Sequence, residues 1–386
     1  MHLSSKPIAA LACLLSLPYT TLIKSPEPLK QPVKNSSSQK IQAAILLDVS
    51  NSMDGLIEQA KAQLWNMVSV MGKVKCNDNY PPSIEIALYE YGRSNNDEKQ
   101  GYIKQISAFT TDLDQLSRNL FSLTTYGGDE FCGHVIHTSL NELKWDADSS
   151  TYKVIFIAGN EDFLQGNVLW TTACAEARKK NVVVNTIYCG DRMQGIREHW
   201  NLNSECGNGS FTNINQDAKM EEIPTPYDTT LIVLNTKLNA TYIGYGQARD
   251  EKIAMQAEMD RSNMLAGKAA GLKRIAVKGQ ANLYNNAGWD LVDAVRADST
   301  LIKKIDYKEL PANLKDKSRA QLQLFVTEKS VERIEIQKEI ARVSVQRDAY
   351  IVEEKKNRAG NKESTLETEI EKIIREQVKR YNMQVQ

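Results

Sequence analysis

Three oxygen-bearing side chains follow the first apolar segment of the 386-residue sequence: Asp48, Ser50 and Ser52. A carboxylate followed at two-residue steps by two hydroxyls sends three oxygens the same way from one loop. Such a set suits a hard octahedral ion like Mg²⁺, which takes oxygen ligands at about 2.1 Å. Three ligands do not fill an octahedral shell, so water, other loops and a binding partner must complete it. A simpler alternative for Ser52 is that it caps a helix beginning near Asp54.

From residue 41 the sequence alternates between apolar segments and amphipathic helical patterns. This alternation is typical of a parallel sheet covered on both faces. We therefore predict an α/β fold with a doubly wound, mostly parallel six-stranded sheet (Rossmann-like), followed by an α-helical C-terminal region. Ligands of such sheets bind at the carboxyl ends of the strands, where Asp48 lies. The expected strands are 41–48, 84–91, 102–107, 152–158, 182–189 and 209–214, and the expected helices are 54–72, 112–123, 130–144, 165–180 and 227–239.

The Asp-x-Ser-x-Ser segment, placed after an apolar strand, resembles the metal-ion-dependent adhesion site of von Willebrand factor type A (vWA) domains. The resemblance covers about residues 40–240. In that family a Thr from a second loop joins the site, and Thr125 is the expected ligand here, with Thr124 as the alternative. The resemblance implies that Asp48, Ser50, Ser52 and Thr125 hold Mg²⁺ or Mn²⁺ with one position open, and that an Asp or Glu of a partner protein fills this position.

The third loop departs from the family pattern. Gly159 stands where an Asp belongs, and the loop reads Gly-Asn-Glu, which resembles a set of exported bacterial vWA proteins. A missing carboxylate should weaken metal binding unless Glu161, Asp162 or Asp129 supplies a charge. Asp129 and Glu130 have an alternative role as acids that open a helix.

The N-terminal residues predict export. Lys6 precedes an apolar stretch, 8–17, of the length of a signal-peptide core and too short to span a bilayer. Lipidation of Cys13 is an alternative that we favour less, because the apolar run continues past it. The expected organisation is a signal peptide at 1–24, a Pro/Ser-rich linker at 25–39, a vWA domain at 40–240 and a helical, charge-rich region at 241–386. The expected location is periplasmic or extracellular, with a possible association with the cell envelope.

Export would place the cysteines in an oxidising compartment. Cys189 ends an apolar strand and Cys206 lies in the following loop, so this is the pair we expect first. Cys174 lies in an apolar helical stretch, where a buried reduced thiol is an equally good interpretation. Cys132, His134 and His137 lie close together, but their spacing matches no standard zinc site, and packing explains them better.

Beyond residue 240 the apolar residues recur at three and four positions, which predicts helices. Residues 315–386 contain 16 Lys and Arg and 13 Asp and Glu, and such a mixed density of charge predicts long, solvent-exposed helices. Gly360 and Asn361 interrupt the pattern, and a second helix is expected from about residue 365 to 380. No sustained coiled-coil repeat is present.

The composition excludes several classes of protein. The chain has 48 Lys and Arg against 48 Asp and Glu, which argues against a general nucleic-acid binder. No phosphate-binding Gly-rich loop and no Gly-x-Ser-x-Gly motif occurs. Ser50 stands where a phosphatase of the haloacid dehalogenase type would need a second Asp, and the mature sequence contains no stretch long enough for a membrane span.

The predicted function is therefore metal-dependent protein–protein interaction or adhesion, without enzymatic activity. The alternative is a metal-independent structural or assembly scaffold of the cell envelope that acts through the helical C-terminal region. The sequence leaves the partner and the oligomeric state open.

Overall fold

The computed structural model describes residues 39–76, 81–205, 209–215, 222–357 and 366–385. The predicted signal peptide and nearly all of the predicted linker lie outside these residues, as do Cys13, Cys206, Gly360 and Asn361. Export, lipidation and the exact linker therefore stay predictions.

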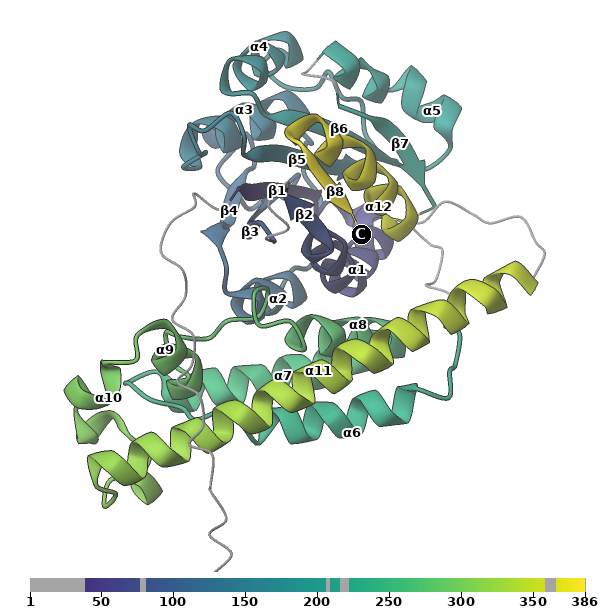
Figure 1. The fold of residues 1–386 in the computed structure, drawn as a ribbon. Coiled ribbons are helices and arrows are strands. Elements are labelled where there is room, and N and C mark those ends of the chain that lie inside the picture. Colours follow the sequence, from purple (N-terminus) through teal and green to yellow (C-terminus); the bar gives the residue numbers. More distant parts are fainter. Residues whose placement is uncertain (1–38, 77–80, 206–208, 216–221, 358–365, 386) are drawn as a thin grey trace, which may run out of the picture. The chain divides into compact units, whose positions relative to one another are not determined.

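The centre of the α/β part is a six-stranded sheet with the strand order β4-β3-β1-β5-β6-β7 (Figure 1). All neighbouring strands are parallel except β3 and β4, which are antiparallel. This confirms the predicted doubly wound, mostly parallel sheet. The strands are β1 (Lys40–Asp48), β3 (Ser83–Tyr91), β4 (Lys104–Thr110), β5 (Tyr152–Gly159), β6 (Val183–Cys189) and β7 (Phe211–Ile214).

The direction of winding reverses at β1. The chain passes from β1 outward to β3 and β4, then crosses back and adds β5, β6 and β7 on the other side. In open α/β sheets, ligands bind at the carboxyl ends of the strands that flank such a reversal. Here those strands are β1 and β5, which end at Asp48 and Gly159.

Both faces of the sheet are covered, because the strands are apolar at both odd and even positions. Alternate residues of β1 point to opposite faces: Ala43 and Leu47 enter one core, and Ala44 and Leu46 enter the other. The first core contains α1 (Asp54–Gly72) and α2 (Leu113–Phe121), and the second contains α3 (Cys132–Glu142) and α4 (Trp170–Lys180). A short helix, α5 (Arg192–Arg197), follows β6.

The C-terminal half is helical, as predicted, and it packs on the α1 and α2 side of the sheet through α7 and α8. Its helices are α6 (Asp228–Asn239), α7 (Arg249–Ala266), α8 (Lys268–Lys278), α9 (Leu291–Ala297), α10 (Leu301–Lys304), α11 (Arg319–Asn357) and α12 (Leu366–Gln377). Short 3₁₀ helices lie at Asn51–Met53, Glu98–Gln100, Trp200–Glu205, Tyr307–Glu309, Ala312–Leu314 and Val378–Tyr381.

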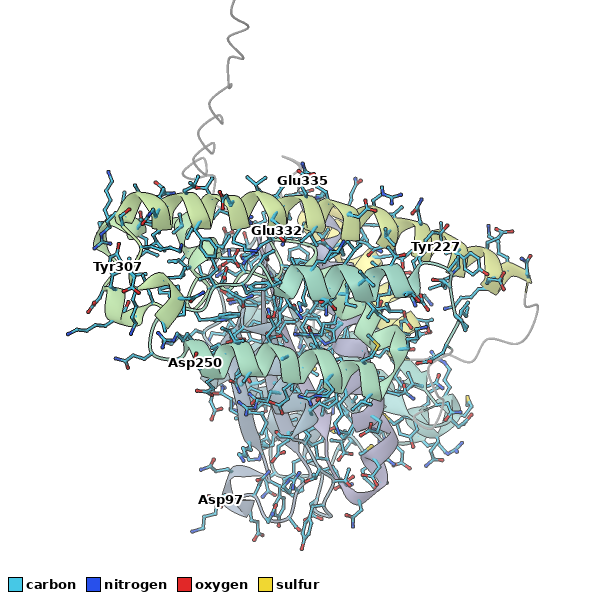
Figure 2. All side chains as sticks on the ribbon, turned by 90° about the horizontal axis from the view of Figure 1, so that it is seen from below. Asp97, Tyr227, Asp250, Tyr307, Glu332 and Glu335 are labelled. Atoms are coloured by element: carbon cyan, nitrogen blue, oxygen red, sulfur yellow. The ribbon has the colours of Figure 1, made fainter. Side chains whose placement is uncertain are left out.

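The helix α11 has 39 residues, which corresponds to about 58 Å at 1.5 Å per residue. Glu332 and Glu335 are exposed on it (Figure 2) and pair with lysines three residues away. The predicted solvent exposure is nevertheless wrong for the opposite face, which packs against α6 and α8. Arg333 and Arg347 are buried there and are neutralised by acids from outside α11: Asp293 on α9, Asp290 just before it, and Asp228 on α6. A charge count over α11 alone does not reveal such partners.

The last described segment returns to the sheet side of the molecule. Helix α12 packs against α1, and β8 (Met383–Val385) pairs with β2 (Val74–Cys76) as a separate antiparallel ribbon. Its apolar side chains belong to the same core as β1 and α1. The side chain of Gln377 is buried among the strands: Tyr152 donates to its Oε1 at 2.7 Å, and its Nε2 donates to Asn185 at 2.7 Å.

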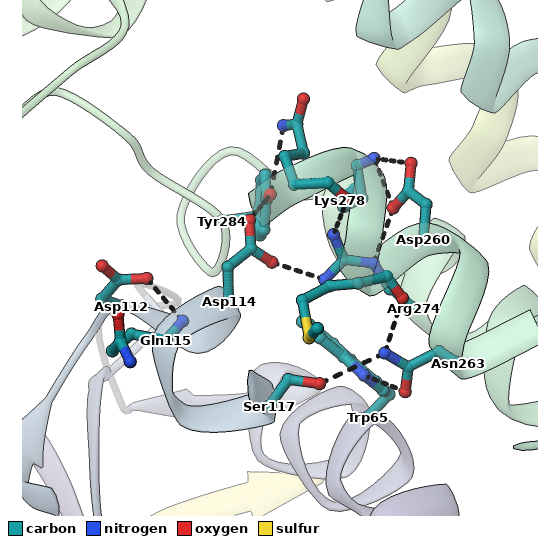
Figure 3. A network of polar contacts seen from close by, with 12 residues as sticks. Trp65, Asp112, Asp114, Gln115, Ser117, Asp260, Asn263, Arg274, Lys278 and Tyr284 are labelled. Carbon is teal, nitrogen blue, oxygen red and sulfur yellow. Dashed lines mark hydrogen bonds and ion pairs between the residues drawn. The ribbon is translucent and has the colours of Figure 1, made fainter. Parts of the chain in front are cut away.

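A buried polar network joins α2 to the helical half (Figure 3). Arg274 on α8 donates to Asp114 on α2 at 2.5 Å and to Asp260 on α7 at 2.6 Å. Lys278 also contacts Asp260, at 2.8 Å, and the Arg274 guanidinium lies 4.6 Å from the Trp65 ring on α1. Burial lowers the pKa of Lys278 to about 8. The two cations and two acids neutralise one another in a largely buried network, in which only Asp260 is partly exposed.

The cysteines differ from the prediction. The pairing of Cys189 with Cys206 is wrong, because Cys189 is a free thiol buried in the core between the sheet and α1. Cys174, on α4, is instead disulfide-bonded. Within the described part of the chain, none of the helices is both long and apolar enough to cross a lipid bilayer.

Candidate metal centre

Four segments meet at the carboxyl edge of the sheet around the end of β1. The amide of Val49 donates to the Tyr91 carbonyl at 2.9 Å, which joins the ends of β1 and β3. The amide of Tyr126 donates to the Val49 carbonyl at 2.8 Å, which attaches the segment before α3 to the same place. The Asn160 side chain donates to Ser52 at 3.2 Å, so the segment after β5 also reaches the first loop.

Asp48 is completely buried at the end of β1. Its Oδ1 accepts a hydrogen bond from the Ser50 amide at 2.7 Å. Its Oδ2 is also buried and has no hydrogen-bond partner among the described residues. A buried carboxylate oxygen without a partner is costly unless a proton or another cation neutralises it.

The structure brings Ser50 and Ser52 to the side of Asp48. Their hydroxyl oxygens lie 3.5 Å apart, and Ser50 is buried whereas Ser52 is exposed. The alternative that Ser52 caps α1 is wrong, because Met53 is the N-cap residue and no side chain makes a capping bond there. Both hydroxyls lie in the loop that follows Asp48, and hydroxyl oxygens are ligands that Mg²⁺ accepts.

Of the two candidate threonines, Thr125 is the one beside the first loop. Its hydroxyl donates to the Asp54 carboxylate at 2.5 Å, at the start of α1. Thr124 is exposed, and Arg93 donates to its hydroxyl at 3.2 Å. Thr125 thus shares the edge with Asp48, Ser50 and Ser52, but it contacts Asp54 rather than Asp48.

Gly159 adjoins Asp48, and the space beyond it is filled. A Cβ atom at this position would lie 2.6 Å from the Tyr91 hydroxyl and 3.1 Å from Asp48 Oδ2. Tyr91 is fully buried and donates to the Ala158 carbonyl at 2.9 Å, so its ring cannot easily move aside. An Asp at position 159 is therefore incompatible with this packing.

The acid that the sequence interpretation missed is Glu130. It is only 7% exposed, and the nearby Ser50 side chain lowers the pKa of its carboxyl group. It does not open a helix, since α3 begins at Cys132 and has no acid in its first turn. The two glycines before Glu130 were a signal in the sequence that this segment packs closely on its neighbours. The backbone at Gly127 and Gly128 approaches Asn51 and the Ser94 amide, where a side chain would collide.

The electrostatics of this edge are unusual. Burial raises the pKa of Asp48 to about 7, with a smaller lowering by Ser50 and a further rise from Glu161. Burial, followed by Asp48 and Glu161, raises the pKa of Glu130 to about 8. No Lys, Arg or His forms an ion pair with Asp48 or Glu130 in the described part of the chain. The edge therefore favours either protons or an added cation.

These directions predict how pH affects the metal-free protein. The folded pKa of Asp48, about 7, is above its ordinary value of 3.8, so its contribution to stability is full at low pH and is lost as pH rises through about 7. We expect the melting temperature in EDTA to fall between about pH 4 and pH 7, and Asp48→Asn to reduce that fall; the remaining fall is expected from Glu130, whose pKa is also raised, to about 8. An equal fall in wild type and Asp48→Asn would show that Asp48 is not a buried, unpaired acid.

The donor chemistry fits a hard divalent cation. Among the described residues no group of three or more His, Cys, Asp and Glu side chains is arranged to hold a metal. The available donors are instead two carboxylates with neighbouring hydroxyls, as Mg²⁺ and Mn²⁺ prefer. Cys132 is packed against the Tyr91 hydroxyl at 3.8 Å and His137 contacts Asn141, in keeping with their interpretation as packed residues.

No protein-family model and no curated protein matches the chain. Several solved structures do, at low similarity. Proximal thread matrix protein 1 from the mussel byssus is 12% identical, with 47% of this chain and 43% of that chain covered and a TM-score of 0.34. The SpRpn10 VWA domain is 15% identical, with 45% and 88% covered and a TM-score of 0.34. A von Willebrand factor type A protein from Catenulispora acidiphila is 12% identical, with 46% and 39% covered and a TM-score of 0.34.

The matched segment spans less than half of the mussel protein. One structure of that mussel protein has a zinc-occupied MIDAS motif. At these identities and TM-scores, the fold class of the present chain rests on its own strand order and on the reversal at β1.

Proposed function

We propose that the protein binds a protein partner through a divalent cation held at the carboxyl edge of the sheet, in the manner of a vWA adhesion site. The observation that carries the proposal is the buried Oδ2 of Asp48, which has no hydrogen-bond partner among the described residues, in a loop whose Ser50 and Ser52 hydroxyl oxygens lie 3.5 Å apart. An unpaired buried carboxylate at this position is explained most simply as a cation ligand.

In this proposal Asp48, Ser50 and Ser52 hold Mg²⁺ or Mn²⁺, with Thr125 at the same edge. The bound ion would supply one coordination position for an Asp or Glu of the partner. Asp48 provides negative charge at a buried position, where electrostatic interactions are strong. Ser50 provides an uncharged oxygen and, through its amide, fixes the carboxylate orientation. The protein would act by binding, without a catalytic reaction.

The surface around the site suits a protein partner. The segments that follow the strands at this edge carry large apolar side chains that are exposed, and such side chains are typical of interaction surfaces when they gather. They are Tyr126, Leu164, Leu169 and Met193. A partner that presents an acid among apolar residues would match both the ion and these side chains.

We further propose that the protein works outside the cytoplasm, in the periplasm or extracellularly. The disulfide at Cys174 supports this location, because disulfides persist mainly in oxidising compartments. The predicted signal peptide would direct the chain there.

The test is the thermal stability of the full chain, stripped with EDTA and then given Mg²⁺, Mn²⁺, Ca²⁺ or Zn²⁺. A ligand that binds only the folded state at 100 times its Kd adds about 2.7 kcal/mol of stability, so we expect a rise of several degrees with Mg²⁺ or Mn²⁺. Asp48→Asn should abolish the rise, whereas Asp250→Asn, at an exposed position on α7, should keep it.

Each outcome of that test separates the two candidate functions. A rise that depends on Asp48 supports the metal-dependent interaction. No rise at millimolar concentrations of any of the four metals would refute it and would favour the metal-independent scaffold. A rise that persists in Asp48→Asn would show that the ion binds elsewhere.

A further inference from the structure

The buried acids at the carboxyl edge come as a pair. Asp48 and Glu130 arrive from different segments, one at the end of β1 and one just before α3, yet both are buried. Ser50 adjoins both acids: its amide donates to Asp48 Oδ1 at 2.7 Å, and its side chain lowers the pKa of Glu130. Two neighbouring buried acids that form no ion pair with a basic residue among the described residues repel each other unless a proton or a cation neutralises them.

The backbone at Gly92 shows how close the two acids are. Gly92 has a φ of +81°, and a Cβ atom there would lie 2.9 Å from Asp48 Oδ1 and 3.0 Å from Glu130 Cγ. Both side chains therefore border the same small space beside β3. Only glycine leaves this space open and adopts this backbone conformation without strain.

We infer that Glu130 is a second carboxylate ligand of the cation, and that it supplies the charge that a third-loop Asp supplies in the vWA pattern. This inference rests on the proposed metal site. The two acids approach from β1 and from the segment before α3, while the position after β5 is closed by Tyr91. In this arrangement, which we call the rebuilt site, the second carboxylate comes from the segment before α3 and not from the segment after β5, where Gly159 lies.

The charge of the rebuilt site matches that of a divalent cation. Asp48 and Glu130 together carry two negative charges, which a divalent cation neutralises, whereas Ser50 and Ser52 add neutral oxygens. Glu161 and Asp129 raise the pKa of Glu130 but are exposed, so water screens them. The chemical class of ligand is therefore a hard divalent cation such as Mg²⁺ or Mn²⁺.

The test compares Mn²⁺ binding to the full chain by isothermal titration calorimetry in four forms: wild type, Asp48→Asn, Glu130→Gln and the neighbouring exposed control Asp129→Asn. Glu130→Gln keeps the shape of the side chain and removes its charge. We expect it to weaken Mn²⁺ binding at least tenfold, while the metal-free melting temperature stays equal or rises because a buried charge is lost. Asp129→Asn should change the affinity less than twofold.

The outcomes distinguish this inference from the proposed function. If wild type binds Mn²⁺, Asp48→Asn does not, and Glu130→Gln binds within twofold of wild type, the role of Glu130 is refuted while the metal site stands. If wild type does not bind Mn²⁺ at all, both are refuted. A metal-free Glu130→Gln protein that melts well below wild type would show a structural role instead.

The variant Gly159→Asp provides a second, independent test of the inference. If Gly159 marks a decayed vWA site, restoring the acid should tighten Mn²⁺ binding. In the rebuilt site the new side chain would collide with Tyr91 and Asp48. We therefore expect a lower melting temperature and no gain in affinity, and a clear gain in affinity would overturn the inference.

Discussion

A chain that ends at residue 365 is expected to lose its folded state. The cut removes α12 and β8, whose apolar side chains form part of the core beneath α1. Burial of large apolar side chains contributes roughly 1.5–3 kcal/mol each, so the loss of six of them amounts to roughly 9–18 kcal/mol, comparable to the whole stability of a domain. The side chains removed are Ile370, Ile373, Ile374, Val378, Tyr381 and Met383. Circular dichroism and a thermal melt would measure the result.

A matched pair of substitutions tests the same packing in the intact chain. Ile374→Ala, at a fully buried position, should cost about 2–5 kcal/mol in urea unfolding. Lys372→Ala, at an exposed position on the same helix, should change stability by less than about 0.5 kcal/mol. A cooperative melt of the shortened chain at the wild-type temperature would mean that α12 does not belong to the core.

Replacement of Arg274 by methionine is expected to destabilise the protein by about 3–5 kcal/mol. Arg274, on α8, is buried and forms ion pairs with Asp114 on α2 and with Asp260 on α7. Although burial lowers its pKa, Asp114, Tyr284 and Asp260 raise the pKa above its ordinary value, so the arginine stays charged. Methionine would leave Asp114 buried without its cation, and a lone buried charge costs more than the pair contributes.

Equilibrium unfolding in urea measures this effect, with Arg261→Met on the exposed side of α7 as the control. The control should change stability by less than about 0.5 kcal/mol. Adding Asp114→Asn to Arg274→Met should recover part of the loss, because the orphaned charge is then gone. A loss below about 1 kcal/mol, with no recovery in the double variant, would show that the network is not a closed set of neutralised charges.

Much of the fold is predictable from local pattern. Strands β1, β5 and β6 are continuous apolar runs, and helices such as α1 lie between them, so their order follows from the sequence. The packing of α12 and β8 against the first half of the chain does not follow from local pattern. Gln377 and Tyr152 are 225 residues apart, and no local periodicity indicates that the chain returns to the sheet.

The same limit applies to charges. Basic residues are rarely buried, and the charge density of residues 315–386 predicted exposure for Arg333. Arg333 and Arg274 are nevertheless both buried. They are buried here since their acids lie on other helices, Asp114 on α2 and Asp290 next to α9. Nearness in sequence does not predict the state of the cysteines either: Cys189 is a buried free thiol although Cys206 is close to it in the sequence, whereas Cys174, which is also buried, is disulfide-bonded.

Part of the candidate site is predictable from the sequence, because three of its residues lie in one short loop. Asp48, Ser50 and Ser52 lie on a single turn, so their spacing alone predicts convergence. Glu130 joins them only through the folding of a second segment. Its identity as an acid near a helix start suggested a different role, which the start of α3 at Cys132 excludes.

The most direct test of the central claim is a crystal structure of the full chain soaked in Mn²⁺, with data collected for the anomalous signal of manganese. We predict a single strong anomalous peak at the carboxyl edge of the sheet, about 2.1–2.3 Å from Asp48 Oδ2, with Ser50 in its coordination shell. No peak at that position in millimolar Mn²⁺, with Asp48 Oδ2 satisfied by a protein donor, would contradict a divalent cation site.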